Sequence, residues 1–242
     1  MADADARPVG GVDGCRGGWV LCTLDAAGRI TVELVPEVAL AVDLVRTGAL
    51  ALLGIDMPIA LPATWGRQAD DEARRRLGPR RSSLFPTPPR FLLDHCDDFA
   101  DANAASRAAT GRGLSIQTFH LLAKVAELQA ALGPVDEPVA PDLAERVVEC
   151  HPESCFATLA GAPLTTTKRT ADGRRERSAL LQLRVADDLA ALLADRPPGV
   201  AADDLLDAVA AAEAMGRHRR GEAMVLGGDA VDDRGLPLRL VA

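Results

Sequence analysis

The chain has 242 residues, of which 48% are hydrophobic and 26% charged, a balance that indicates a globular protein and excludes a wholly disordered one. Its net charge of −8 opposes non-specific binding to nucleic acid, although clusters of arginine leave local basic patches open. Five cysteines without a C-x-x-C pair exclude a zinc knuckle, and the lack of a signal segment or of roughly 18 consecutive apolar residues leads us to expect a cytoplasmic protein without a membrane partner.

The opening pattern predicts an antiparallel β-meander. A strand from residue 9, a glycine-rich turn at 14–18, a strand at 19–24 and a third strand at 30–35 follow one another closely. Apolar residues at helical spacing then predict a helix at 37–47, and the apolar run at 49–55 is typical of a fully buried strand. That strand ends directly on Asp56.

The rest of the chain predicts more helices than strands. From residue 57 to about 112 the sequence is rich in Pro and Arg, and we expect loops over one end of the sheet around a helix at 67–77. The later elements expected are a helix at 115–132, a strand at 146–150, a helix from 152 to 159, helices at 177–193 and 202–217, and a terminal hairpin at 224–241. The pattern predicts a single α/β domain over residues 8–242, with 57–112 as a loop insertion and 1–7 disordered.

Three carboxylates stand at the ends of predicted strands: Asp13, Asp56 and Glu149. Because ligands gather outside the carboxyl ends of strands in open α/β sheets, side chains from three segments can converge there. Carboxylates a few ångströms apart repel one another and bind protons unless a hard divalent cation such as Mg²⁺ or Mn²⁺ offsets their charge. These positions therefore predict a divalent-metal site.

The predicted helix at 202–217 adds an acidic pair. Asp204 and Asp207 share one helix face, which Ala208 and Ala211 continue with side chains small enough for close packing on the sheet. We expect both aspartates to join the metal site. The alternative is a first helical turn whose aspartates interact favourably with the helix dipole.

Several loop residues suit recognition of phosphate through forked or charged contacts. The candidates are Arg80, Arg81, Ser82, Lys168 and Arg177. His151 lies two residues after Glu149 on the same side of an extended strand, so these two form a candidate acid/base pair. A surface role without a ligand is the alternative for each loop residue, and a helix cap is the alternative for His151.

Six motifs spread over nearly the whole chain resemble one known family. They are the segments 11–19 (GVDGCRGGW), 55–58 (IDMP), 77–85 (LGPRRSSLF), 113–117 (GLSIQ), 149–153 (ECHPE) and 203–208 (DDLLDA). Their combination resembles domain-of-unknown-function family 429, a prokaryotic family described as predicted nucleases of ribonuclease H-like fold. It is more distantly similar to Holliday-junction resolvases of the RuvC type.

The resemblance implies a ribonuclease H-like mixed sheet with an opening β-meander, flanked by helices. It also implies that Asp13 is shared by two metal ions, that Asp56 is the second acid, and that Asp204 and Asp207 supply the ligands from the helix. Glu149 lies outside the resolvase pattern and would be an extra ligand or a base close to the metals.

We therefore predict a nuclease or other phosphodiester hydrolase that uses Mg²⁺ or Mn²⁺, with nucleic acid of unspecified type as its partner. An aromatic content of 3% makes base stacking scarce and counts against this prediction. One alternative is an ATP-using phosphotransferase of the sugar-kinase and actin group, which shares the glycine-rich turn but needs two such domains. The other is a non-catalytic module that binds a metal or a small ligand in the acidic pocket.

Overall fold

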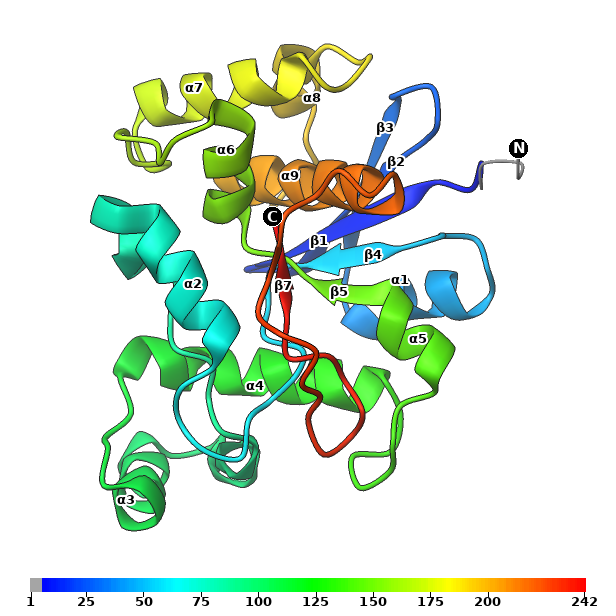
Figure 1. Ribbon diagram of the computed structural model, residues 1–242. Helices are drawn as coiled ribbons and strands as arrows, with labels where there is room; N and C mark the ends of the chain where they lie inside the picture. Colours follow the sequence, from blue (N-terminus) through cyan, green and yellow to red (C-terminus); the bar gives the residue numbers. More distant parts are fainter. Residues whose placement is uncertain (1–5) are drawn as a thin grey trace.

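The computed structural model describes residues 6–242, and Figure 1 shows a mixed sheet with helices on both faces. Its strands are β1 (Val9–Cys15), β2 (Gly18–Leu24), β3 (Ile30–Val35), β4 (Leu53–Ile55) and β5 (Val147–Glu149), in the spatial order β3-β2-β1-β4-β5. The first three strands form an antiparallel meander, whereas β4 runs parallel to β1 and β5 parallel to β4. The predicted α/β class and the opening meander are confirmed.

The register of the parallel strands brings their carboxyl ends to one edge of the sheet. Val12 pairs with Ile55, and Ile55 pairs with Glu149 on β5. The backbone N–H of Asp56 donates to the carbonyl of Val12 at 2.9 Å, so the strand pairing continues one residue beyond β4. Asp13, Asp56 and Glu149 therefore emerge at the same edge of the sheet. The carboxyl ends of β1, β4 and β5 point to the left in Figure 1.

Alternating side chains of β2 face two separate cores. Val20 and Cys22 belong to the core beneath α9 (Ala202–Arg219), whereas Trp19 and Leu21 belong to the core on the opposite face. The core beneath α9 also receives side chains from three further helices: α6 (Pro152–Ala160), α7 (Ala171–Gln182) and α8 (Leu189–Ala194). The core on the opposite face receives side chains from α1 (Val38–Arg46), α4 (Ile116–Ala131) and α5 (Pro141–Arg146). This alternation is the two-residue period of a strand whose two faces are both covered.

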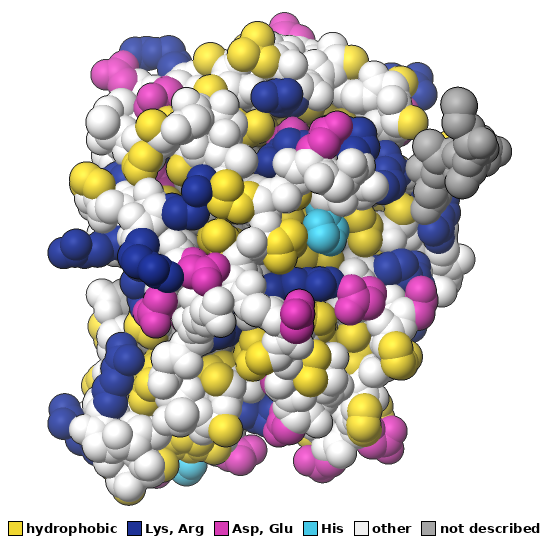
Figure 2. Space-filling model, in the orientation of Figure 1, with side chains coloured by type: hydrophobic (Ala, Val, Ile, Leu, Met, Phe, Trp, Pro, Cys, Tyr) yellow, Lys and Arg dark blue, Asp and Glu magenta, His cyan; other side chains and the backbone are white. Residues whose placement is uncertain are grey.

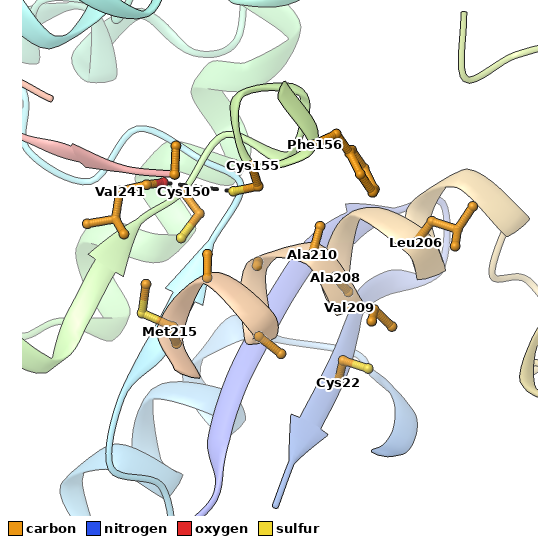
Figure 3. Close-up of a cluster of buried hydrophobic side chains, with 14 of the residues drawn as sticks. Cys22, Cys150, Cys155, Phe156, Leu206, Ala208, Val209, Ala210, Met215 and Val241 are labelled. Atoms are coloured by element: carbon orange, nitrogen blue, oxygen red, sulfur yellow. Dashed lines mark hydrogen bonds between the residues drawn. The ribbon is translucent and has the colours of Figure 1, made fainter. Parts of the chain in front are cut away.

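The core beneath α9 is built largely from small side chains. Figure 3 shows Ala208 and Ala210 on α9 near Phe156 of α6, with Met215 near Cys150. Within residues 6–242 all five cysteines are free thiols, and Cys15, Cys22, Cys150 and Cys155 are buried.

The amphipathic stretch 177–193 is not one helix, as we predicted, but two. α7 ends at Gln182, and α8 begins at Leu189 because the carboxylate of Asp188 accepts the N–H groups of Ala190 and Ala191. The intervening segment packs on the β2–β3 turn, where the N–H of Ala186 donates to the carbonyl of Gly28 at 2.7 Å. A local cap and a tertiary contact thus override the helical periodicity.

Other boundaries differ from the sequence predictions. The segment 57–112, expected as loops around one helix, contains α2 (Gln68–Leu77), the 3₁₀ helices η1 (Gly78–Ser83) and η2 (Arg90–His95), and α3 (Phe99–Thr110). The terminal hairpin predicted at 224–241 is much shorter in the structure, with only two paired residues on each strand: β6 (Val225–Leu226) and β7 (Leu240–Val241). The predicted disorder at 1–7 falls mainly on residues 1–5, which lie outside the described residues; Ala6 and Arg7 are exposed.

Candidate metal centre

Three carboxylates from separate elements meet at the carboxyl edge of the sheet. Asp13 lies near the carboxyl end of β1, Asp56 follows β4, and Asp207 lies in the second turn of α9. One carboxylate oxygen from each residue lies within 4.8 Å of the other two. Asp13 and Asp207 are buried, and Asp56 is half-buried. We call these three residues the acidic triad.

Glycine at position 11 allows α9 to come close enough to form the triad. A Cβ atom at Gly11 would lie 2.1 Å from the carbonyl oxygen of Ala208 and 2.2 Å from the amide nitrogen of Ala212. The backbone of α9 therefore rests directly on β1, two residues before Asp13. Since Asp207 adjoins Ala208, the same contact sets the distance between the carboxylates of the two elements.

Burial and mutual repulsion shift the titration of the triad. Burial, followed by the charges of Asp56 and Asp207, raises the pKa of Asp13 well above its ordinary value. Burial and Asp207 raise the pKa of Asp56 to about 8. Burial raises the pKa of Asp207 to about 6 despite the opposing effect of Lys168. Without an added cation, the cluster therefore retains protons near neutral pH.

Lys168 supplies a cation to the triad from the loop before α7. Its ammonium donates a short hydrogen bond to Oδ2 of Asp207. Burial lowers the pKa of Lys168, but the carboxylates of Asp207, Asp56 and Asp13 outweigh this effect and raise it above its ordinary value. The lysine therefore stays charged and neutralises part of the triad. Its predicted phosphate contact remains a prediction.

Asp204, the other predicted ligand on the helix, lies outside the triad. It is half-buried one turn nearer the start of α9. Burial and the neighbouring charge of Asp203 raise its pKa, and its own charge raises the pKa of Asp13. It is thus close enough to influence the centre electrostatically, while Asp207 alone supplies the carboxylate of α9 to the triad.

Glu149 is held by an arginine rather than joined to the triad. Nη1 of Arg67 donates to its Oε2 at 2.7 Å, Nη2 of Arg67 reaches its Oε1, and the N–H of Ile59 adds a contact of 3.0 Å. Arg67 also binds Asp70 of α2 at 2.6 Å, and all these side chains are buried. Burial raises the pKa of Glu149, and Arg67 opposes the rise.

His151 is not hydrogen-bonded to Glu149, its proposed partner. Its Nδ1 lies 2.8 Å from the hydroxyl of Ser154, and its Nε2 lies 3.4 Å from the carbonyl oxygen of Ser83. Burial lowers the pKa of His151 to about 4, so the imidazole is neutral near pH 7. The ring precedes α6 without capping it through a side-chain bond to the backbone.

The candidate phosphate-binding arginines have different environments. Arg177 is fully buried, and its Nη2 donates to both oxygens of Glu153 at 2.7 and 2.8 Å. Arg80, which lines the cleft over the triad, donates from its Nε to Oε1 of Glu153 at 3.1 Å. Arg81 is exposed on η1, next to Ser82. Arg177 therefore joins α6 to α7, whereas Arg81 and Ser82 of η1 remain open to a ligand.

A cleft of about 690 Å³ lies over the triad. Its lining includes residues that sequence reasoning did not single out for this site: Phe85, His120, Lys124, Glu153 and Arg169. Figure 2 shows Lys and Arg side chains along the left edge of the molecule, over the C-terminal end of α2. The only signals for these residues in the sequence were the motifs around 77–85 and 149–153 and the loop position of Arg169.

The donor set fits a hard divalent cation. All three members of the triad offer carboxylate oxygens, which Mg²⁺ and Mn²⁺ prefer, and among residues 6–242 no His or Cys joins this group. The raised pKa values of three neighbouring acids indicate negative charge that a divalent cation would offset. Asp13, Asp56 and Asp207 are the residues that would hold it.

Comparison with known proteins gives one match. A family model described as "Protein of unknown function (DUF429)" matches residues 11–231. Searches of curated proteins and of solved structures found no match. Among residues 6–242, every helix is too short or too polar to cross a bilayer.

Proposed function

The chain belongs to the DUF429 family of proteins of unknown function, and from this premise and the acidic triad we propose that it is a divalent-metal-dependent hydrolase of phosphodiesters. The observation that carries the proposal is the meeting of three carboxylates from β1, the end of β4 and α9 on the floor of a cleft. Several buried carboxylates that lie close together without cations to offset their charge destabilise the folded protein. Chemistry at a bound metal is a common reason why such a cluster is retained.

The order of the elements supports a ribonuclease H-like interpretation of the fold. The opening strand of the meander carries Asp13, a later central strand leads to Asp56, and the last long helix carries Asp207. The resolvases that the sequence resembles distribute their acids in the same way. This parallel favours hydrolysis of a phosphodiester over the other reactions that acidic metal sites perform.

Each residue around the triad has a distinct part in the proposed mechanism. A bound Mg²⁺ or Mn²⁺ would polarise the phosphoryl group and lower the pKa of water. Asp13, Asp56 and Asp207 would hold the cation, and the ammonium of Lys168 would offer positive charge beside a bound phosphate. Arg67 fixes Glu149 beside this centre, and neutral His151 is positioned by Ser154.

Hydrolysis assays in Mn²⁺ and in Mg²⁺ test the proposal. The substrates are bis(p-nitrophenyl) phosphate and single-stranded, duplex and branched DNA and RNA, each with and without EDTA. We expect metal-dependent turnover that falls about a hundredfold or more in Asp13→Asn, since one preorganised charged group contributes on this scale. Asp43→Asn, which changes an exposed aspartate on α1, is the matched control and should retain full activity.

Absence of turnover on every substrate by folded, metal-loaded protein would reject the proposal. Metal binding without turnover would then favour the non-catalytic module. The phosphotransferase of the sugar-kinase and actin group gains no support, since residues 6–242 contain one five-stranded sheet and one two-stranded sheet and no second domain of the required kind.

A further inference from the structure

The cleft over the triad carries an aromatic residue that the proposed hydrolysis does not use. Phe85 follows η1, lines the cleft and is 41% exposed. The exposed ring of His120 on α4 lines the same cleft, together with Leu84 and Leu121. An exposed aromatic ring in a cleft of about 690 Å³ suits one planar heterocycle of a small-ligand size.

Two basic segments border the same cleft. One is η1, where Arg80 and Ser82 line the cleft and Arg81 is exposed beside them. The other is the loop 167–169, where Lys168 and Arg169 line the cleft. Within the described chain the guanidinium groups of Arg81 and Arg169 have no hydrogen-bond or ion-pair partner, whereas Arg80 and Lys168 bind Glu153 and Asp207.

Free guanidinium groups on two separate segments beside a metal-binding cleft suit a chain of phosphates. The net charge of the protein is −8, so phosphates are attracted only locally, by these two basic segments, and not by the protein surface as a whole. A base can reach Phe85 only if it is unstacked, which costs least in a single strand.

We propose that the cleft binds single-stranded nucleic acid, with one base against Phe85 and the flanking phosphates on Arg81 and Arg169. This inference rests on the proposed function, because it places the phosphodiester between those phosphates over the triad. The low aromatic content of the chain does not oppose it, since one exposed ring at the right place is enough for one base. Affinity then has a stacking part and an electrostatic part that can be separated.

Binding measured by fluorescence anisotropy in Ca²⁺ tests the inference without requiring turnover. The probes are labelled dT12, an abasic 12-mer with the same phosphates, and a 12-base-pair duplex. We expect dT12 to bind at least about tenfold more tightly than either of the others, as stacking of one base contributes on this scale. Two phosphate contacts predict a slope of log affinity against log salt of about −1.4.

Variants separate the two parts. Phe85→Ala should bring dT12 to the affinity of the abasic strand without changing the latter, and Phe85→Trp should restore the preference. Arg169→Ala and Arg81→Ala should weaken the binding of dT12 and of the abasic strand equally, and should make both affinities less dependent on salt concentration. Arg29→Ala, which changes an exposed arginine on the β2–β3 turn, is the control and should change neither.

Equal affinity of wild type for dT12 and the abasic strand, tighter binding of the duplex, or no binding of any strand would overturn the inference. An unchanged dT12 affinity in Phe85→Ala would overturn it as well. Hydrolysis of bis(p-nitrophenyl) phosphate is measured in parallel. Activity on that small substrate together with any of these outcomes would leave the proposed hydrolase standing and remove only the single-stranded substrate.

Discussion

The ammonium of Lys168 stands beside three carboxylates that would otherwise repel one another without compensation. It binds Asp207 directly, while Asp13 and Asp56 gain only its longer-range attraction. An added divalent cation and this ammonium both neutralise Asp207, so they compete for the same carboxylate. Lys168 therefore acts in the metal-free protein as an internal counter-ion.

Replacing Lys168 with methionine should have opposite effects on stability and on metal binding. The free energy of unfolding in EDTA should fall by about 1 kcal/mol, a modest loss because 37% of the lysine side chain is exposed and solvent screens the pair. Mn²⁺ should bind more tightly by calorimetry, since a competing cation is gone. Arg175→Met is the control: it removes an exposed cation that does not line the cleft and should leave Mn²⁺ affinity unchanged. Weaker Mn²⁺ binding in Lys168→Met would show that the lysine holds Asp207 in place instead.

The raised pKa values of the triad predict how stability depends on pH. As the pH rises above their ordinary pKa of 3.8, the folded, metal-free protein keeps a proton on Asp207 up to about pH 6 and one on Asp56 up to about pH 8, whereas the unfolded chain has released both. The unfolded state therefore binds fewer protons, and the free energy of unfolding in EDTA should decrease as the pH rises through this window.

Urea denaturation at a series of pH values measures this decrease. Asp56→Asn should flatten it, because the amide does not titrate, and Asp43→Asn should leave it as in wild type. Stability that rises between these pH values in the wild-type protein would contradict the assigned pKa shifts.

At the scale of elements, the contact between β1 and α9 decides the geometry of the centre. A methyl group at position 11 would meet the backbone of α9 at 2.1 and 2.2 Å, and backbone cannot yield as a flexible side chain can. Gly11→Ala should therefore push α9 away from β1 and cost about 3 kcal/mol or more in the free energy of unfolding.

Position 17 provides the comparison for Gly11→Ala. A Cβ there meets the flexible end of Leu34 at 3.3 Å, so Gly17→Ala should change stability by less than about 0.5 kcal/mol. Chemical denaturation gives both values, and Mn²⁺ affinity should fall in Gly11→Ala alone. Equal stability of the two variants would refute the close approach of α9.

Arg67 ties the start of α2 to the end of β5. Its guanidinium binds Asp70 and Glu149, and all three side chains are at most 6% exposed. Arg67→Met should lower the free energy of unfolding by about 3 to 5 kcal/mol, because it leaves two buried carboxylates without their partner. Arg175→Met breaks an exposed pair with Asp172 and should cost less than about 1 kcal/mol. Similar losses in both variants, by urea denaturation, would argue against the buried network.

The strand-end acids illustrate what could and could not be predicted from the sequence. Asp13 and Asp56 were found because each lies at or just past the end of a recognisable strand, and the carboxyl ends of parallel strands share an edge of the sheet. Glu149 has the same local signature, but Arg67, 82 residues earlier in the chain, binds it instead. The amino-acid sequence around Glu149 contains no pattern that predicts such a long-range partner.

The late helix shows a similar limit. Asp204 and Asp207 are three residues apart on one face, and helical periodicity cannot tell which of them meets β1. The contact at Gly11 makes that choice, and it favours Asp207. Likewise, the break between α7 and α8 depends on Asp188 as a cap and on the docking of Ala186 against Gly28, which apolar spacing does not report.

For the molecule as a whole, the resemblance of six separated motifs carried more information than any single one. The family match over residues 11–231 confirms that combination, and the mixed sheet confirms the order of the opening strands. In the insertion, α2 was predicted but α3 was not, because small and polar residues dominate α3 and the caps Asp98 and Gly111 set its limits.

The most direct measurement is a calorimetric titration of Mn²⁺ into wild type, Asp13→Asn and the control Asp43→Asn. We expect wild type and Asp43→Asn to bind Mn²⁺ with release of protons, since the triad must ionise to bind the cation. Asp13→Asn should remain folded and lose about a hundredfold or more in affinity. Wild-type affinity in Asp13→Asn, or no Mn²⁺ binding by the wild-type protein, would contradict the metal centre.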